Sequence, residues 1–261
     1  MLPPKSLIGM VHIPATPGTP HSRHGVAEIV AHAIADARVL RDAGFDGVIV
    51  ENMHDRPYVN GPHDPVLTST MTRAVDAVVR EVGKALKVGV QILSRGEREA
   101  LAIAHTCGAN FIRCENFVFS HVADEGLMQD AAAGALLRYR KVIGAESVKI
   151  FADVQKKHAS HAMTGDLSIA DWAHAAEFFC ADGLIVTGLS TGMPTDASDV
   201  LMAKKAGKLP VFVGSGVTPG QVESLFASAD GLIVGSYIKE GGKWDGAIDL
   251  QRCREIVKAR K

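Results

Sequence analysis

Several features are scarce or missing in this chain of 261 residues, and each of them excludes a class of protein. No apolar run approaches the roughly 18 residues that a membrane-spanning helix needs, so we expect no transmembrane segment. The formal net charge is only −1, which argues against a nucleic-acid-binding surface and against a polybasic patch for lipids. The amino-terminal residues MLPPKSLIGMVH lack the apolar core of a signal peptide. We therefore expect a cytoplasmic protein.

Cysteine is also scarce, and its four positions follow no metal-binding or redox motif. Cys107, Cys114, Cys180 and Cys253 are scattered, with no CxxC pair among them. Their apolar or helical surroundings predict four reduced, buried residues of an intracellular protein. The sequence has no HExxH motif and no Cys/His ligand set, so we expect no structural zinc.

Short apolar runs recur along the chain at the spacing that alternating strands and helices require. Apolar residues make up 47% of the chain, enough for a large core, and its length suits a single (β/α)8 barrel of ~250 residues. Continuous rather than alternating apolar runs are typical of parallel strands that are covered by helices. The expected strands are residues 7–11, 47–50, 88–93, 111–114, 148–152, 184–187, 211–213 and 232–234. We predict a TIM barrel that forms one domain, residues 1–261.

Helical periodicity fills most of the gaps between these runs. Apolar residues that recur every three or four positions predict helices over residues 26–40, 71–86, 132–143, 169–179, 197–205 and 248–260. Thr218-Pro219 predicts the start of a further, short helix. The segments GVIVEN, GLIVTG and GLIVGS resemble one another, and this internal similarity favours a barrel over an open doubly wound sheet.

The stretch between residues 210 and 242 contains two apolar runs, each followed directly by small residues. Gly214, Ser215 and Gly216 follow the first run, and Gly235 and Ser236 follow the second. Two such loops side by side would present backbone N–H groups to an anion, as the last two units of many TIM barrels do. The sequence therefore predicts a phosphate site, although the glycines could instead serve only as tight turns.

Polar residues follow the strand runs and are expected to gather at one end of the barrel. Alternate residues of a barrel strand point inward, so Glu51 follows Ile49 inward, and Arg113 and Glu115 share a face. The same reasoning gives an inward ring of six polar side chains: His12, Glu51, Gln91, Glu115, Asp153 and Thr187. We expect His12, Gln91, Arg113 and Thr187 to contact the substrate.

Three carboxylates at one barrel mouth repel each other unless positive charge neutralises them. Arg113, Lys156, Lys157, a substrate cation or a bound divalent ion such as Mg²⁺ could provide that charge. In the catalytic interpretation Glu51, Glu115 and Asp153 transfer protons or hold the ion. In the alternative they form structural salt bridges with Arg113 and Arg95. No cofactor is certain from the sequence.

Two lysines and a histidine follow the fifth expected strand. Lys157 could form a Schiff base, bind phosphate or act as an acid, or it could be a solvated loop lysine. His158 could carry protons or be a plain surface histidine. For Lys156 the simpler interpretation is a solvated loop lysine. Four long loops, over residues 13–25, 52–65, 116–130 and 154–167, are expected to carry the chemistry. The small-residue loop 188–192 either closes over a ligand or makes a turn.

Together these motifs resemble the BtpA/SgcQ family over nearly the whole chain. The matching segments are GMVH…PGTP from Gly9, GVIVEN from Gly47 with Asp55 and Pro57, FIRCEN from Phe111, FADVQKKHAS from Phe151, VTGLSTG from Val186, VFVGSGVT from Val211 and GLIVGSYIKEGGKW from Gly231. The resemblance implies a (β/α)8 barrel and places Lys157-His158 on the family's Lys-His pair. It transfers no catalytic residues, and it implies either a sugar-related role or a role in photosystem I biogenesis.

Three functions are compatible with the sequence. The first is an enzyme that acts on a phosphorylated sugar or nucleotide-like metabolite as a lyase, isomerase or hydrolase. The others are a non-catalytic assembly factor and a metal-dependent hydrolase such as a nucleosidase. We expect a small phosphorylated ligand, no nucleic-acid partner and self-association into a homo-oligomer, the last by analogy with other barrels.

Overall fold

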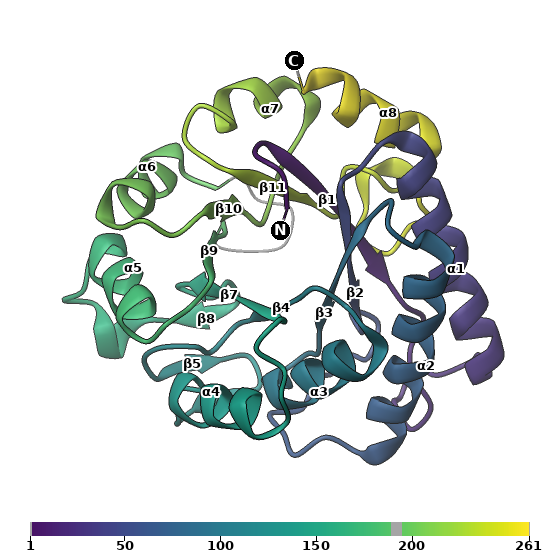
Figure 1. Ribbon diagram of the computed structural model, residues 1–261, viewed down its shortest axis with the longest axis horizontal. Helices are drawn as coiled ribbons and strands as arrows, with labels where there is room; N and C mark the ends of the chain where they lie inside the picture. The colour runs from purple at the N-terminus through teal and green to yellow at the C-terminus, as the bar shows by residue number, and fades with distance from the viewer. Residues whose placement is uncertain (1, 189–194, 261) are drawn as a thin grey trace.

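Eight parallel strands close into a barrel in the computed structural model, which describes residues 2–188 and 195–260. Around the barrel the strands follow the chain order, with hydrogen-bonded neighbours throughout (Figure 1). The strands are β1 (Ser6–His12), β2 (Gly47–Glu51), β3 (Lys87–Gln91), β4 (Phe111–Cys114), β7 (Lys149–Val154), β9 (Gly183–Val186), β10 (Val211–Val213) and β11 (Gly231–Val234). The predicted TIM barrel is confirmed, and every expected strand is present within two residues of its expected ends.

Helices cover the outside of the barrel (Figure 1). They are α1 (Val26–Ala43), α2 (Pro65–Val82), α3 (Glu97–Cys107), α4 (Ala133–Val142), α5 (Ile169–Phe178), α6 (Ala197–Ala206), α7 (Pro219–Leu225) and α8 (Leu250–Ala259). Helix α1 ends where Gly44 adopts a left-handed conformation at φ 98°, as its sequence predicts. Helix α3 was not expected from the sequence, and α2 begins six residues earlier than expected, at Pro65.

The interior of the barrel has an aromatic floor. Phe111, Phe151 and Phe212 point inward, and the ring centroids of Phe151 lie 5.0 Å from Phe111 and 4.9 Å from Phe212. Each phenylalanine is paired in register with a glycine of a neighbouring strand: Phe111 with Gly89, Phe151 with Gly183 and Phe212 with Gly231. A Cβ atom on any of these glycines would overlap the paired ring. The glycines therefore make room for the rings.

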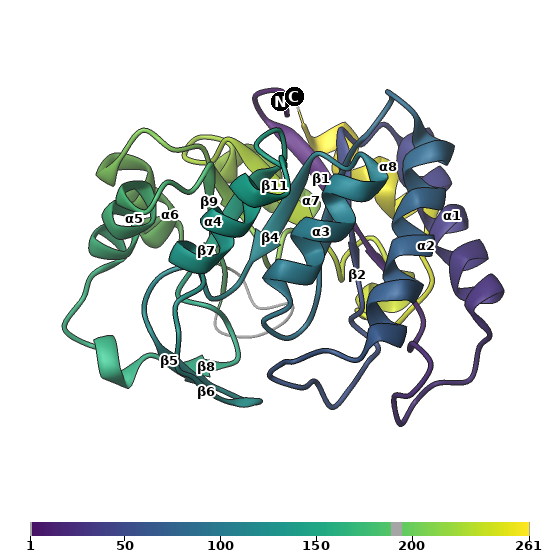
Figure 2. The ribbon, with the colours of Figure 1, turned by 60° about the horizontal axis from the view of Figure 1, so that its bottom comes forward.

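A small second sheet lies at the end of the barrel away from the chain termini (Figure 2). Its strands β5 (His121–Ala123), β6 (Gly126–Met128) and β8 (Ala159–Ser160) are antiparallel, with β5 in the centre. They lie within loops 116–130 and 154–167, which were expected to be long loops without strands. Two short 3₁₀ helices, η1 (Ala162–Thr164) and η2 (Glu240–Gly242), complete the elements.

The four cysteines and the small-residue loop 188–192 were also subjects of prediction. All four cysteines are free thiols. Cys114 and Cys253 are buried and Cys107 is half-buried against the core, but Cys180 is exposed, so the prediction of four buried cysteines is wrong at Cys180. Cys180 follows α5 at the surface, where the chain turns toward β9. In the predicted small-residue loop 188–192, residues 189–192 lie outside the described residues.

Candidate active site at the carboxyl end of the barrel

The inward positions of the strands change from apolar to polar along the barrel axis. Above the aromatic floor, β4 continues from Phe111 to Arg113 and β7 continues from Phe151 to Asp153. The resulting polar layer lies where TIM barrels carry their sites, at the carboxyl ends of the strands. Five of its side chains are buried: His12, Glu51, Arg113, Glu115 and Asp153.

His12 and Glu51 form a close, buried pair. The ring nitrogen Nδ1 of His12 lies 3.1 Å from the carbonyl oxygen of Trp244, and because a carbonyl only accepts, Nδ1 is the donor. Nε2 lies 3.3 Å from Oε2 of Glu51. Burial raises the pKa of Glu51, but the hydrogen bond from His12 and nearby positive charges outweigh burial, so the pKa is lowered overall. Glu51 is therefore an ionised carboxylate that accepts a hydrogen bond from the ring of His12.

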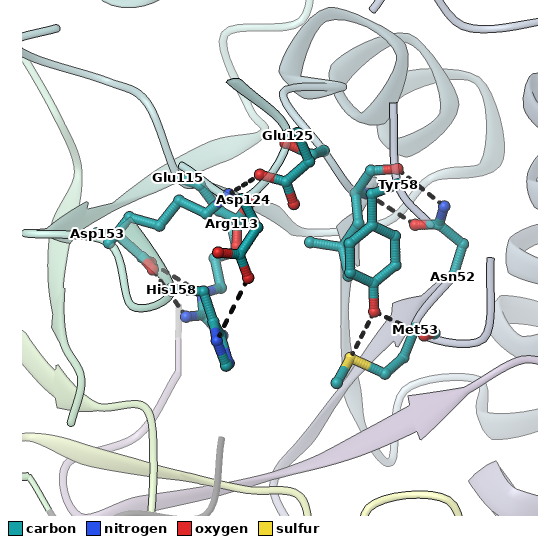
Figure 3. A network of polar contacts seen from close by, with 12 residues as sticks. Asn52, Met53, Tyr58, Arg113, Glu115, Asp124, Glu125, Asp153 and His158 are labelled. Atoms are coloured by element: carbon teal, nitrogen blue, oxygen red, sulfur yellow. Dashed lines mark hydrogen bonds and ion pairs between the residues drawn. The ribbon is translucent and has the colours of Figure 1, made fainter. Parts of the chain in front are cut away.

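Arg113 and Asp153 form a buried, two-pronged ion pair (Figure 3). Nε of Arg113 donates to Oδ1 of Asp153 at 2.8 Å, and Nη2 donates to Oδ2 at 2.7 Å. The arginine side chain is 3% exposed and the aspartate side chain is fully buried. This geometry is the strongest that the two groups can adopt, and it fixes both in place.

Lys156 is buried between two glutamates, which contradicts its interpretation as a solvated loop lysine. Its Nζ lies 3.4 Å from Glu115 and 3.2 Å from Glu125, the latter delivered by the turn between β5 and β6. Burial is the largest influence on Glu115 and raises its pKa. Lys156 and Arg113 lower the pKa, Asp153 and Glu51 raise it, and the net result is a raised pKa. The alternative that Arg95 neutralises these acids is also wrong, since Arg95 pairs with Asp130.

Lys157 points toward the mouth and has no acidic partner within 4.0 Å in the described part of the chain. Burial and the nearby Arg113 lower its pKa, although Glu51, Glu115 and Asp153 act in the opposite direction. A lysine of this kind is a better nucleophile or base than a solvated one. Its neighbour His158 is exposed at the rim, where Nδ1 lies 3.8 Å from Asp124 (Figure 3).

The asparagines that follow Glu51 and Glu115 hold the loops beneath the site. Asn52 accepts a hydrogen bond from the amide of Leu93 at 2.7 Å and donates to Oδ2 of Asp55 at 3.0 Å. Asn116 donates to the carbonyl oxygen of Asp130 at 2.6 Å. In each Glu-Asn pair the glutamate faces the barrel and the asparagine fixes its loop.

The loops after β10 and β11 lie side by side and line one cavity with the polar layer. This cavity, about 40 Å³, opens beside a larger one of about 500 Å³, and the two share Gly216, Gly235 and Ser236. The small cavity is lined by Met10, His12, Glu51, Met53, Arg113, Lys157, Gly214, Ser215, Gly216, Gly235 and Ser236. The predicted phosphate residues therefore lie next to the predicted catalytic residues.

Gly214 and Gly235 lack a side chain for different physical reasons. The amide of Gly214 donates to the carbonyl of Val186 at 2.8 Å, and a Cβ atom there would lie 2.7 Å from Ile185. Gly214 is thus required by packing. A Cβ atom at Gly235 would come no closer than 3.4 Å, to Met10, so the space beside Gly235 belongs to the cavity.

Gln91 and Thr187 complete the predicted ring and offer unused hydrogen-bonding atoms. Gln91 is 1% exposed, and its Oε1 has no hydrogen-bond partner among the described residues. The hydroxyl of Thr187 is likewise without a partner there. Buried polar atoms in this state point to a bound molecule or water.

Several residues of the site were missed in the sequence. Tyr58, Met53 and Trp244 line the mouth together with Glu125 and Lys156. The Tyr58 hydroxyl donates to the carbonyl of Met53 at 2.7 Å (Figure 3). Tyr58 directly follows the Asp55…Pro57 motif and Trp244 ends the GLIVGSYIKEGGKW motif, so both could have been identified from the sequence. Glu125 carried none, because its place depends on the small sheet.

Each carboxylate of the polar layer is matched by a basic side chain. His12 faces Glu51, Arg113 faces Asp153 and Lys156 faces Glu115. Within residues 2–188 and 195–260, no group of three or more His, Cys, Asp or Glu side chains is arranged to hold a metal ion. The layer is therefore balanced by the chain's own charges.

Glu97, at the start of α3, gives the site a pH-dependent stability. It is 5% exposed, and burial raises its pKa to about 7. A raised pKa stabilises the folded protein below pH 4.5, and that stability is lost as the pH rises toward 7. One unit of pKa shift corresponds to about 1.36 kcal/mol, so the wild type is expected to lose roughly 3 kcal/mol of folding stability as the pH rises toward 7. Glu97→Gln should not show this loss.

The measurement is urea unfolding of both proteins between pH 5 and 8. The stability of the wild type should fall with pH relative to that of Glu97→Gln, and Glu99→Gln in the same helical turn should follow the wild type. A constant difference between the wild type and Glu97→Gln across this range contradicts the prediction.

The closed parallel barrel, with paired acids and bases and small-residue loops lining a cavity at its carboxyl end, defines a TIM-barrel protein. The chain belongs to the BtpA family, whose model matches residues 4–261. This confirms the resemblance found in the sequence.

Two relatives and one solved structure illustrate these similarities. An uncharacterised mitochondrial protein of Caenorhabditis elegans is 45% identical over 255 residues, 97% of this chain and 91% of the relative. The photosystem I biogenesis protein BtpA of Synechocystis is 35% identical over 254 residues, 97% of this chain and 87% of the relative. The (S)-3-O-geranylgeranylglyceryl phosphate synthase of Thermoplasma acidophilum, in complex with sn-glycerol-1-phosphate, has a TM-score of 0.61 at 18% identity, covering 99% of this chain and 94% of the synthase.

The synthase shares the fold, but its sequence identity is too low for a residue-by-residue comparison.

In the described part of the chain, no helix has both the length and the apolar character needed to cross a membrane.

Proposed function

We propose that the protein is an enzyme that acts on a small phosphorylated metabolite, a sugar phosphate or a nucleotide-like compound. One observation carries the proposal: a single cavity is lined by Glu51, Arg113 and Lys157 and also by the loops 214–216 and 235–236. The phosphate would lie against the two loops, with its charge near Arg113 and Lys157. The substrate carbons would then lie over the acids of the polar layer.

Acid–base chemistry is supported by two glutamates with opposite properties. Glu51 and Glu115 line the same cavity at the mouth, of about 250 Å³. The pKa of Glu51 is lowered and that of Glu115 is raised. Titratable groups whose pKa values are pushed apart are suited to act as base and acid in one site. In our proposal Glu51 accepts a proton and Glu115 donates one.

Lys157 supplies a second reactive group in the same cavity. With its pKa lowered, a larger share of the amine is uncharged and available to attack a carbonyl carbon or to accept a proton. His12 holds Glu51, Arg113 holds Asp153, and His158 lies at the rim. These roles suit an isomerase or a lyase, and hydrolysis is the third option. The fold of the glycerol-phosphate-bound synthase also supports a phosphorylated ligand.

Gly235→Asp tests the proposal because it places a carboxylate in the cavity without overlapping a neighbour. We expect inorganic phosphate and ribose 5-phosphate to raise the melting temperature of the wild type and not that of Gly235→Asp. Ligand at 100 times its Kd adds about 2.7 kcal/mol to the stability. Gly134→Asp, on α4, makes the same charge change away from the mouth and should respond like the wild type. A wild type that neither ligand stabilises refutes the proposal.

An assembly role is the second candidate, favoured by the name of the Synechocystis relative. Apolar side chains are exposed on α5 and α6 and just after α5, namely Phe178, Phe179, Leu201 and Met202. They offer a surface for a protein partner or a second copy of the chain. Glu51→Gln would leave such a role intact and would abolish an enzymatic one.

A further inference from the structure

Lys239, in the loop after β11, is a buried lysine that the proposed chemistry does not use. It is 2% exposed. Its amide donates to the carbonyl of Ser236 at 3.1 Å, and its backbone pairs with Ile248 across the loop. The lysine is therefore held firmly by its own backbone.

The ammonium group of Lys239 has no matched negative charge. Within residues 2–188 and 195–260, no carboxylate oxygen forms an ion pair within 4.0 Å of its Nζ, although Asp36, Glu51 and Asp245 lie farther away. Burial lowers the pKa of Lys239, and these acids act in the opposite direction. A buried charge without a partner is costly, and proteins usually pair it.

Lys239 lines a cavity of about 430 Å³ between the loops that follow β1, β2 and β11. This volume lies within the range of small-molecule sites. Three permanent positive charges line the cavity, on Arg23, Arg56 and Lys239, against two carboxylates, Asp36 and Asp245. Five imidazole rings add hydrogen-bond donors: His12, His21, His24, His32 and His54.

The electrostatic environment of the cavity is positive. Burial lowers the pKa of His54 to about 4, and His12, Lys239 and Arg56 lower it in addition. Burial also raises the pKa of Asp36, and the nearby Lys239, His12 and His32 act in the opposite direction. The cavity thus repels a further cation and favours an anion.

Trp244 and His12 separate this cavity from the barrel mouth. The ring centroid of Trp244 lies 5.1 Å from that of His54 and 4.6 Å from the guanidinium carbon of Arg56. His12 lines both the small cavity of the mouth and this one. The two cavities are therefore neighbours with different linings.

We propose that the cavity around Lys239 is a second anion site, which binds a phosphoryl group whose charge pairs with Lys239. Arginine and lysine together with imidazole donors are a typical set of phosphate ligands. The loops 214–216 and 235–236 take no part in this site, so it stands or falls independently of the proposed function. A ligand with two phosphoryl groups would find a site on each side of His12.

The test compares inorganic diphosphate binding by calorimetry and thermal shift in three variants at Lys239 and Gly235. Lys239→Met removes the buried charge and keeps the length of the side chain, so the unliganded protein should melt at the same temperature or higher. Its affinity for diphosphate at this site should fall by about tenfold or more. Lys239→Arg should retain binding. Gly235→Asp blocks only the mouth and should leave the Lys239-dependent binding in place.

Two controls keep the result specific. Lys258→Met, at an exposed lysine of α8, should bind diphosphate like the wild type. A crystal soaked in tungstate should show anomalous density next to Nζ of Lys239, which tests the site even if Lys239→Met fails to fold. Unchanged diphosphate affinity in Lys239→Met, tungstate density elsewhere only, or equal stabilisation by citrate would overturn the proposal.

Discussion

Asp153→Asn is expected to lower the free energy of unfolding by about 3–5 kcal/mol. The reason is that the variant leaves the guanidinium of Arg113, which is 3% exposed, buried without its counterion. Both hydrogen bonds, at 2.8 and 2.7 Å, lose their ionised acceptor. Chemical unfolding at neutral pH measures the change.

The double variant Arg113→Met/Asp153→Leu separates the ion pair from its burial. Replacing both partners with apolar side chains of similar size removes the unpaired charge, so the double variant should recover most of the lost stability. Glu146→Gln breaks the exposed pair with Lys141 and should cause no measurable change. If Asp153→Asn unfolds like the wild type, the pair does not hold the layer together.

Phe111→Ala is expected to cost about 3–5 kcal/mol, because it removes a 2% exposed ring from the floor of the barrel. A substitution at Gly89, which is paired with Phe111, tests the same contact. A Cβ atom at Gly89 would overlap the Phe111 ring, so Gly89→Ala alone should cost about 1–3 kcal/mol.

The Phe111→Ala/Gly89→Ala double variant completes a cycle on this pair. Its total cost should be smaller than the sum of the single costs, because the alanine methyl group enters space that the ring has vacated. Phe178→Ala, at a side chain that is 82% exposed, is the control and should unfold like the wild type. Strictly additive costs would show that the ring and the glycine do not constrain each other.

The strands were predictable from the sequence because parallel barrel strands are buried on both faces and therefore appear as continuous apolar runs. Helix α3 was not predicted, because only two of its five buried residues, Leu101 and Ile103, are large and apolar, and the acid Glu97 is another of the five. The small sheet was also missed. Val122 pairs with Ser160 across 38 positions, and strands of two or three residues have no periodicity to detect.

The members of the polar layer were predictable, but their pairing was not. Strand alternation alone brings Glu51, Arg113 and Asp153 to the inside of the barrel. The choice of partner depends on side-chain geometry across strands. Alternation fails beyond β7, where Gln155 and His158 have positive φ values of 52° and 56°. These turns in the backbone direct Lys156 into the protein and Lys157 toward the mouth, which no periodic pattern predicts.

The aromatic floor has a consequence for how the site responds to its solvent. Arg113 lies two residues after Phe111 on β4 and Asp153 lies two residues after Phe151 on β7, so the ion pair forms the next inward layer after the rings. A cavity of about 600 Å³ at the opposite end of the barrel is lined by the same three phenylalanines. Counterions that enter that cavity stop at the rings, so ionic strength can weaken the pair only through the mouth. An occupied mouth would then insulate the pair on both sides.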